Sequence, residues 1–544
     1  MASENEVAEN EATENEQEKP AEAVKKPTEA GKKTAGKKSD SSSRRPLGEN
    51  FRRFMTDGWA EPDRTVEPLA SSRFTPARWQ AIGRRFPGER LVFPAGAHKQ
   101  RANDLNYAFR PNTSFAYFTG LGEDYDPDAV LVLDPVAPDS PEAKRGLTHT
   151  PALYLHQPAD HTTRDFYMSA EYGEYWIGPR PGLAEFEAMT GIETHDLSQF
   201  ADAVAKDVGA EGGVRVRVIR EADPQANTAV DAARAAGGFD DPDANAADDA
   251  ELHQACAEVR VIKDDYEIDQ LRQAVKATYH GFCSVLRHLD EAVDTPRGER
   301  LIEGWFDANA RFEGNTVGYD TIVASGDHAP RLHWMRNNGT PHAGDLLLMD
   351  AGVEVNDLYT ADITRTFPLN GRFTPLQRRV YDAVFDAQQA AFDACRPGVP
   401  FSVIHDTVMR VTAEKLHELG LLPVSVEEAL SPEGQQHRRW LACGVGHHLG
   451  LDCHDCAQAR DSEYFDAELK PGMVFTIEPG LYFQSDDLLV PPEYRGIGVR
   501  IEDDVLMTED GPEWLSSYIP RTADGVEQWM KEMRDTAETK GDRR

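Results

Sequence analysis

Short apolar runs alternate with amphipathic segments between about residues 51 and 221. FTPARWQAIGRRF has helical spacing with Thr75 and Pro76 at its start, and LVFPAG after it has the composition of a strand. GLAEFEAM predicts another helix, and three further apolar runs predict strands: AVLVLDP, ALYLHQ and GVRVRVIR. This alternation predicts a mixed α/β N-terminal domain over residues 51–221.

Longer amphipathic helices follow from about Glu258 onward. Helical spacing of apolar residues marks three segments: EVRVIKDDYEIDQLRQAVKATYHGFCSVLRHL, TPLQRRVYDAVFDAQQAAFDAC and FSVIHDTVMRVTAEKLHELG. Thr374 caps the second of them, with Pro375 in its first turn. Strands are predicted between and after these helices, at TIVASG, DLLLMDAGVEV, MVFTIEPGLYF and GIGVRIEDDVLM. We therefore expect an α+β domain over residues 258–520, with helices on a mostly antiparallel sheet.

Three segments outside these domains have a biased composition. Residues 1–46 pass from Glu, Asn and Ala to Lys, Thr, Gly and Ser, and contain too few apolar residues to fold, so a disordered tail is predicted. Residues 222–257 are rich in Ala, Asp, Gly and Pro, which indicates an acidic connector or a helical spacer. Residues 521–544 are expected to form a charged C-terminal tail.

Composition narrows the class of protein. The 544 residues are 40% hydrophobic and 28% charged, which is typical of a soluble protein with two or more domains. The net charge of −36 argues against binding of nucleic acid through its phosphates. No apolar stretch approaches the roughly 20 residues that span a bilayer. The six cysteines do not form a disulfide framework, and the first residues lack a secretory signal, so we expect a cytoplasmic protein.

Two aspartates flank a predicted turn in LLLMDAGVEVNDLYTADITRTF. Asn356-Asp357 suits a turn, and in an antiparallel hairpin Asp350 and Asp362 are equidistant from its centre. Such cross-strand partners have Cβ atoms about 5 Å apart. Two carboxylates that close need a positive charge between them, and a divalent cation such as Mn²⁺ supplies it. In the alternative, one aspartate faces solvent and the other only supports the turn.

Further metal-ligand residues occur later in the chain. Glu478 in VFTIEPGLY and Glu502 in GVRIEDD each follow a run of β-forming residues, where burial is expected. A buried acid is costly unless it is paired or binds a metal. With His447 in GVGHHLGLDCHD they complete an oxygen-rich donor set that can hold two divalent ions. Two such ions would stabilise the attacking and leaving groups of a hydrolysis.

The motifs and their order resemble the pita-bread metallopeptidase family, which contains aminopeptidase P, prolidase and methionine aminopeptidase. The closest resemblance is to aminopeptidase P, and four motifs carry it: LLLMDAGVEVNDLYTADITRTFP, GHHLGLDCHD, PGMVFTIEPGLYF and YRGIGVRIEDD. RPNTSFAYFTGL, near Arg110–Leu121, resembles the N-terminal domain of that family. The resemblance covers about residues 66–520. It implies a C-terminal pita-bread catalytic domain, an antiparallel sheet covered by helices, after a smaller α/β N-terminal domain.

The resemblance also implies a role for each metal ligand. Asp350 would bind one metal, Asp362 and Glu502 would bridge both, and His447 with Glu478 would complete the other. A hydroxide between two divalent ions, expected to be Mn²⁺, would attack the carbonyl before proline.

The resemblance implies catalytic helpers as well. Glu478 would shuttle the proton, and His333 in RLHWM and His454 in LDCHD would steady the oxyanion and the proline side. Arg500 lies two residues before Glu502, so on a strand it shares that face and would keep the bridging acids charged.

Several positions leave alternatives open. Arg500 has a second interpretation, as an ion-pair partner of Asp503 or Asp504. His448 is expected to be structural and to point away from the site. Cys453 and Cys456 have C-x-x-C spacing, which a structural zinc or a redox role would also use, but free thiols are favoured because no second such pair exists.

Two departures from the family pattern stand out. Asp350 and Asp362 are twelve residues apart, one more than in most relatives, so the extra residue enters the loop or forms a bulge. Cys443 stands four residues before His447, where relatives often carry a histidine.

The expected function is removal of the N-terminal residue from peptides with proline in second position. The expected binding partners are those peptides and further copies of the chain, which would form a homodimer or a homotetramer. Binding to nucleic acid or to a membrane is not expected. Prolidase, which cuts only Xaa-Pro dipeptides, is the nearest alternative. A metal-free binding protein on the same fold is a further alternative, and a serine hydrolase is disfavoured because no G-x-S-x-G elbow occurs.

Overall fold

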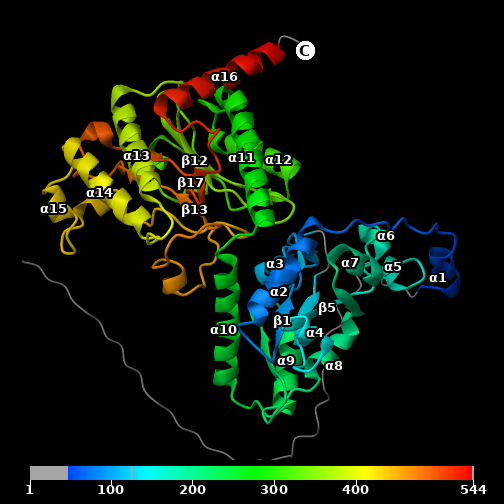
Figure 1. Cartoon of the computed structure of the whole chain (residues 1–544). Helices are drawn as coiled ribbons and strands as arrows, with labels where there is room; N and C mark the ends of the chain where they lie inside the picture. The colour runs from blue at the N-terminus through cyan, green and yellow to red at the C-terminus, as the bar shows by residue number, and fades with distance from the viewer. Residues whose placement is uncertain (1–46, 124–126, 542–544) are drawn as a thin grey trace, which may run out of the picture. The chain divides into compact units, whose positions relative to one another are not determined.

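The computed structural model describes residues 47–123 and 127–541, so the tail predicted at residues 1–46 lies outside the described residues (Figure 1). The described residues divide into two compact units. The smaller unit combines residues 47–60 with Ala159–Gly178, and its helices are α1 (Glu49–Thr56), α5 (Asp165–Met168) and α6 (Glu174–Ile177). Within this unit, the Trp59 ring packs edge-on against Phe166, with ring centroids 5.1 Å apart.

The N-terminal half of the larger unit is built on a five-stranded mixed sheet in the order β6-β5-β4-β1-β7. β1 pairs antiparallel with β4 and parallel with β7. The strands are β1 (Glu89–Pro94), β4 (Val130–Pro135), β5 (His149–Leu155), β6 (Glu193–Asp196) and β7 (Arg215–Val218), beside a small hairpin of β2 (Gln100–Ala102) and β3 (Leu105–Asn106). The helices are α2 (Thr75–Gly83), α3 (Thr113–Thr119), α4 (Pro141–Lys144), α7 (Leu183–Thr190) and α8 (Phe200–Ala205). The predicted α/β alternation is confirmed.

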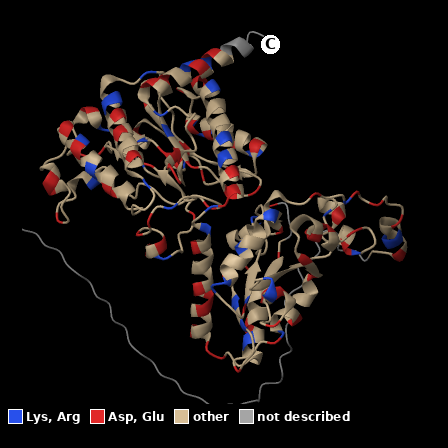
Figure 2. Ribbon diagram, viewed as in Figure 1, with Lys and Arg blue, Asp and Glu red and all other residues tan. Residues whose placement is uncertain are grey.

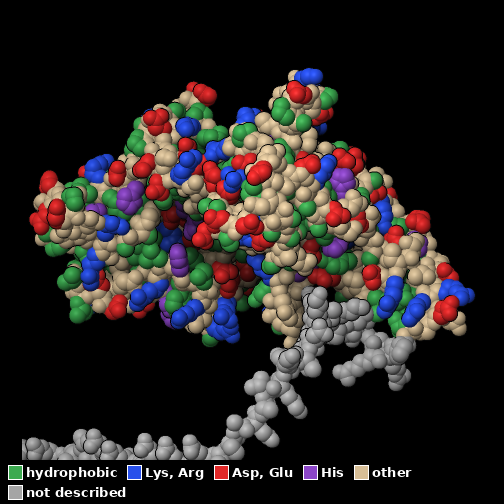
Figure 3. All heavy atoms as spheres, turned by 90° about the horizontal axis from the view of Figure 1, so that it is seen from below, with side chains coloured by type: hydrophobic (Ala, Val, Ile, Leu, Met, Phe, Trp, Pro, Cys, Tyr) green, Lys and Arg blue, Asp and Glu red, His purple; other side chains and the backbone are tan. Residues whose placement is uncertain are grey.

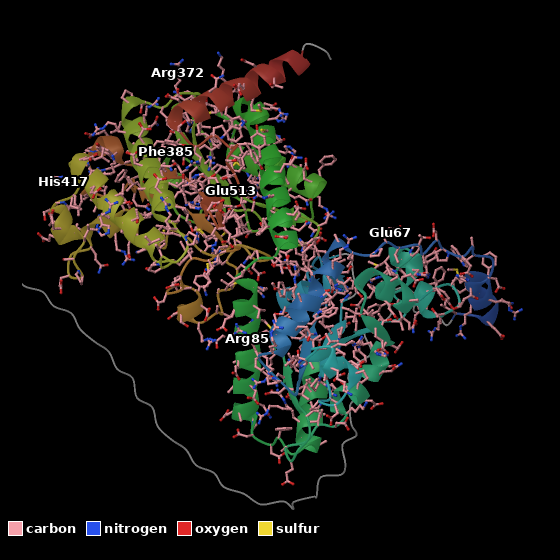
Figure 4. All side chains as sticks on the ribbon, in the orientation of Figure 1. Glu67, Arg85, Arg372, Phe385, His417 and Glu513 are labelled. Atoms are coloured by element: carbon pink, nitrogen blue, oxygen red, sulfur yellow. The ribbon has the colours of Figure 1, made fainter. Side chains whose placement is uncertain are left out.

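The acidic stretch after this sheet forms two helices, α9 (Pro224–Ala236) and α10 (Pro242–Arg260). Figure 2 shows acidic residues along α10. Arg234 of α9 and Asp249 of α10 form a buried ion pair at 2.6 Å, and Arg234 also donates to the Val216 carbonyl of β7. Arg85, labelled in Figure 4, pairs with Glu258 at the end of α10. The helices therefore pack on the sheet that precedes them.

The C-terminal half of the larger unit carries antiparallel strands, and in the view of Figure 1 helices α11 and α13 flank them. The strands are β8 (Thr316–Val317), β9 (Ile322–Ser325), β10 (Leu346–Ala351), β11 (Val353–Glu354), β12 (Ile363–Pro368), β13 (Val474–Ile477), β14 (Gly480–Tyr482), β15 (Gly498–Arg500), β16 (Asp503–Thr508) and β17 (Gly511–Trp514). The helices are α11 (Asp265–Ala292), α12 (Gly298–Glu313), α13 (Pro375–Ala394), α14 (Val403–Glu418), α15 (Val426–Ala429) and α16 (Ala523–Gly541). The predicted α+β architecture is confirmed.

Local sequence sets where the main helices begin. Thr374 caps α13 as predicted: its hydroxyl accepts from the Gln377 amide, and the Gln377 side chain accepts from the Thr374 amide. Asp264 and Glu267 form the same reciprocal cap on α11. That cap separates α11 from α10, where the apolar spacing alone predicted one continuous helical segment.

The surface is charged with both signs. On the face shown in Figure 3, acidic side chains are interspersed with Lys and Arg. Among the described residues, no helix is both long and apolar enough to cross a bilayer.

The segment expected to be a charged C-terminal tail contains α16, which is held by an aromatic cluster. Trp529 of α16 is 2% exposed and stacks on Tyr279 of α11, with ring centroids 5.6 Å apart. It also contacts Phe282 of α11 and Phe367 of β12. Charged residues dominate the composition of the segment, but one buried indole anchors it to the strands.

We expect Trp529→Ala to lower the free energy of unfolding by about 4 kcal/mol, because it leaves a large cavity between α16, α11 and β12. Urea denaturation followed by circular dichroism measures this change. Gln528→Ala, at the exposed neighbouring position, is the control and is expected to stay within about 0.5 kcal/mol of the wild type. Equal effects of the two substitutions would contradict the anchoring role.

Candidate metal centre and active-site cavity

The β10–β12 hairpin brings the first two candidate ligands together, but in a register that differs from the expected one. Asp350 lies opposite Thr364, and Asp362 precedes β12, one diagonal step from Asp350. The expectation that the two aspartates face each other directly is therefore wrong. Their proximity is nevertheless retained, because diagonal neighbours on adjacent strands remain within reach of one another.

The loop explains the register. Leu358 donates its amide to the Val355 carbonyl and adopts φ +70°, so Asn356, Asp357 and Leu358 form a three-residue connection. The Val355 amide donates to the Tyr359 carbonyl, and this hydrogen bond closes the loop. The register is the same in the ladder from Leu346 to Ala351 and in the isolated bridge between Glu354 and Thr360, which places the additional residue in the loop and not in a bulge.

Tyr319 joins the two aspartates. Its hydroxyl lies 2.7 Å from Oδ1 of Asp350 and 2.5 Å from Oδ1 of Asp362. Burial raises the pKa of this phenol well above its ordinary value, and both carboxylates add to the effect, so it stays protonated. Sequence reasoning missed Tyr319, because a tyrosine just before a predicted strand carries no distinguishing signal.

Three carboxylates surround the imidazole of His447. Nε2 of His447 lies 3.4 Å from Oδ2 of Asp362, 3.5 Å from Oε1 of Glu478 and 4.0 Å from Oε1 of Glu502. Ligand atoms of Asp362, His447 and Glu502 all lie within 4.8 Å of one another. The Thr364 hydroxyl donates to Glu502 at 2.7 Å and orients that carboxylate.

All the candidate site residues predicted from the sequence line one cavity of about 610 Å³. They are Asp350, Asp362, His447, Glu478, Glu502, His333, His454 and Arg500. Apolar and aromatic side chains, including Leu332, Tyr464 and Phe465, form other parts of its wall. The cavity thus combines a polar cluster with an apolar surface, as sites for small organic ligands do.

Arg500 belongs to this cluster. Its guanidinium pairs with Asp350, and it donates to the Tyr482 hydroxyl at 3.0 Å and to the Thr364 hydroxyl at 3.1 Å. The alternative interpretation is an ion pair of Arg500 with Asp503 or Asp504. It is wrong for Asp503, because the Asp503 carboxylate pairs with Arg365 at 2.7 Å.

The Asp504 carboxylate also has a partner other than Arg500. Its carboxylate accepts the backbone amide of Asp362 at 3.3 Å. The residue is fully buried, and burial raises its pKa well above the ordinary value.

Electrostatics of the cluster favour a bound cation. Burial raises the pKa of Asp350, raises that of Glu478 to about 7 and raises that of Glu502 well above its usual range. Burial opposes ionisation of Asp362 as well, but hydrogen bonds from His447 and Tyr319 lower its pKa overall. Crowded carboxylates with one imidazole are the donors that divalent ions such as Mn²⁺ prefer, so the residues fit a metal centre.

The other histidine and the C-x-x-C pair are arranged differently. His448 is fully buried against Phe401, with ring centroids 4.8 Å apart, and burial lowers its pKa to about 3, which agrees with a structural role. Cys453 faces the cavity and donates to Asp362 at 3.1 Å, whereas Cys456 donates to Asp455. The two sulfurs therefore have different partners, and the C-x-x-C spacing does not form a shared site.

Comparison with known proteins identifies the relatives of the chain. The model of metallopeptidase family M24 matches residues 269–509, and that of the aminopeptidase P N-terminal domain matches residues 76–215. Xaa-Pro aminopeptidase 1 of Streptomyces coelicolor is 45% identical over 477 residues, which cover 88% of this chain and 91% of that protein. Human Xaa-Pro aminopeptidase 3 is 31% identical, over 82% of each chain. A variant of Escherichia coli aminopeptidase P in complex with substrate is 29% identical with a TM-score of 0.72, over 86% of this chain and all of the other.

The chain belongs to the M24 metallopeptidases of the aminopeptidase P type. In this metallopeptidase, the loop that carries His333 is organised by Glu299 of α12, which is fully buried. The Glu299 carboxylate bonds the Ser325 amide and hydroxyl, Nδ1 of His328, the Trp334 indole and the Gly339 amide. Burial opposes ionisation of Glu299, but these donors outweigh it and lower its pKa below 4.5.

We expect Glu299→Gln to destabilise the protein by roughly 3 kcal/mol at pH 7, because an amide cannot accept from all these donors. A lowered pKa means that the carboxylate stabilises the fold above its ordinary pKa of 4.5 and loses this contribution as the pH falls further. The difference between variant and wild type is therefore expected to shrink below about pH 4.5. Urea denaturation from about pH 3 to pH 7 measures it, with Glu303→Gln on the same helix as the control. A difference that is independent of pH would contradict the assignment.

We expect Tyr319→Phe to weaken Mn²⁺ binding by about 10- to 100-fold, because Asp350 and Asp362 lose the hydroxyl that holds them together. Calorimetric titration of the metal-stripped protein measures the affinity. Tyr494→Phe removes a buried tyrosine hydroxyl outside the cavity and is the control. An affinity unchanged in Tyr319→Phe would show that the hydroxyl does not position the carboxylates.

Proposed function

We propose that this metallopeptidase releases the N-terminal residue from peptides whose second residue is proline. Two divalent ions, expected to be Mn²⁺, would be held by Asp350, Asp362, His447, Glu478 and Glu502. The convergence of these donors in one cavity carries the proposal. Its relatives named Xaa-Pro aminopeptidase support the choice of substrate. When bound, the ions would lower the pKa of a water and stabilise the charge that develops on the scissile carbonyl.

Glu478 is the carboxylate best placed to move a proton. Asp350 and Asp362 accept hydrogen bonds from Tyr319, and Glu502 accepts one from Thr364. The Glu478 side chain is 21% exposed to the cavity, against 2% for Glu502. It can therefore take a proton from water and pass it to the proline nitrogen, which leaves as a secondary amine and needs one.

His333 and His454 would bind the substrate. Both side chains line the cavity and are exposed to it, so their ring nitrogens can donate to a peptide carbonyl. The apolar wall near Leu332 and Phe465 provides a surface for the proline ring, which has no amide proton to satisfy. Arg500 acts on Asp350 and keeps that carboxylate charged and oriented.

We expect metal-stripped protein to regain release of the first residue from an Xaa-Pro-Pro tripeptide when Mn²⁺ is added. Glu478→Gln is expected to lower kcat by about 10²- to 10⁴-fold, because the proton carrier is lost. Glu468→Gln, at an exposed position, is the matched control and should keep wild-type kinetics. Amino-acid release is followed by chromatography.

The same assay separates the alternatives. Cleavage of an Xaa-Pro dipeptide without cleavage of the tripeptide would assign the protein as a prolidase. Absence of cleavage together with absence of metal binding would leave a binding protein on a peptidase fold.

Location and assembly complete the proposal. All six cysteines are free, which supports a reducing compartment such as the cytoplasm. The expected homodimer or homotetramer is tested by light scattering of the purified chain, which distinguishes both from a monomer.

A further inference from the structure

A thiol stands beside the oxygen-rich centre and takes no part in the proposed hydrolysis. Sγ of Cys453 lies 3.1 Å from Oδ2 of Asp362, in the wall of the cavity. The other cysteine of the C-x-x-C pair, Cys456, is buried and directed toward Asp455 and Lys263. Cys453 is therefore a soft sulfur donor placed among hard oxygen donors.

Two imidazoles accompany this sulfur. Ligand atoms of His447, Cys453 and His454 lie within 4.8 Å of one another, one from each side chain. The two histidine rings pack edge to face, with centroids 4.5 Å apart. In a tetrahedral site with bonds of about 2.0–2.3 Å, ligand atoms are about 3.5 Å apart. Cys453 is half-buried and His454 is exposed, so small side-chain rotations can close the set.

We propose that His447, Cys453 and His454 form a second metal site, specific for thiophilic divalent ions such as Zn²⁺. As the metal–sulfur bond forms, the thiol proton passes to solvent, and its hydrogen bond to Asp362 is lost. Two nitrogens and one sulfur are donors typical of zinc, and Mn²⁺ favours oxygen instead. The site thus responds to a class of ion different from the one expected at the carboxylates.

His447 couples the two sites. The same imidazole belongs to the group of Asp362, His447 and Glu502 and to the group of His447, Cys453 and His454. Nδ1 of His447 lies 3.1 Å from the His448 carbonyl oxygen, which leaves Nε2 to bind an ion in either group. One nitrogen cannot bind two ions, so a thiophilic ion at the sulfur site competes for a ligand of the carboxylate centre. Cys453 therefore affects which metal the protein holds, independently of any peptide.

Cobalt binding tests the sulfur ligand directly. Metal-stripped full-length protein is titrated with Co²⁺ alone, and the near-ultraviolet spectrum is recorded for a sulfur-to-cobalt charge-transfer band. We expect the band in the wild type and its loss in Cys453→Ala. Cys443→Ala is the matched control, because Cys443 lines the same cavity but lies outside the donor group, and it should keep the band. Absence of the band in the wild type, persistence in Cys453→Ala, or loss in Cys443→Ala would each overturn the proposal.

A second measurement needs no substitution. The wild-type protein is treated with a thiol-alkylating reagent with and without Zn²⁺, and the modified cysteines are identified by mass spectrometry. Zn²⁺ is expected to slow modification of Cys453 by roughly tenfold or more, because a sulfur bound to the metal is no longer free to react with the reagent. Modification of Cys443 is expected to be unaffected. Equal labelling of Cys453 in both conditions would overturn the site.

These measurements are independent of the proposed function. Neither contains a peptide, so failure to cleave Xaa-Pro-Pro would refute the aminopeptidase assignment and leave the charge-transfer band in place. Conversely, a missing band with intact cleavage would refute only the sulfur site.

Discussion

Burial of several carboxylates in one cavity is the constraint on which the catalytic half of the chain depends. Removal from water favours the protonated form of Asp350, Glu478 and Glu502, and the neighbouring carboxylate of Asp362 raises the pKa of all three further. Arg500 and His447 supply positive charge at two edges of the cluster. Divalent ions would supply it at the centre, so the same crowding that is costly in the free protein favours metal binding.

The surrounding scaffold holds these anions in fixed positions. Tyr319 binds two of them through one hydroxyl, and Thr364 connects Glu502 to the β10–β12 hairpin. One layer further from the cavity, Arg365 and Asp503 form an ion pair in which both side chains are fully buried. Such a pair is costly to break, which makes the strands that carry the ligands resistant to deformation.

The N-terminal half of the larger unit also supports the site. Arg110 donates to the Leu451 carbonyl at 2.7 Å, and the Thr113 hydroxyl donates to Asp452 at 2.8 Å. These contacts hold the start of the loop that continues into His454, one of the residues proposed to bind substrate. The N-terminal half of the larger unit thus contributes to the geometry of a cavity whose candidate metal ligands all lie in the C-terminal half.

The sequence by itself determined the kinds of elements, the cap of α13 at Thr374 and the set of candidate donors, because capping and apolar periodicity are local properties and the motifs keep their order along the chain. Only the tertiary structure decided the register that sets Asp350 opposite Thr364, since a three-residue loop is not distinguished by composition. It also decided the bridging position of Tyr319, whose partners come from distant segments. The same reason applies to the burial of Trp529: its contacts depend on which faces meet in space, and no local pattern encodes that meeting.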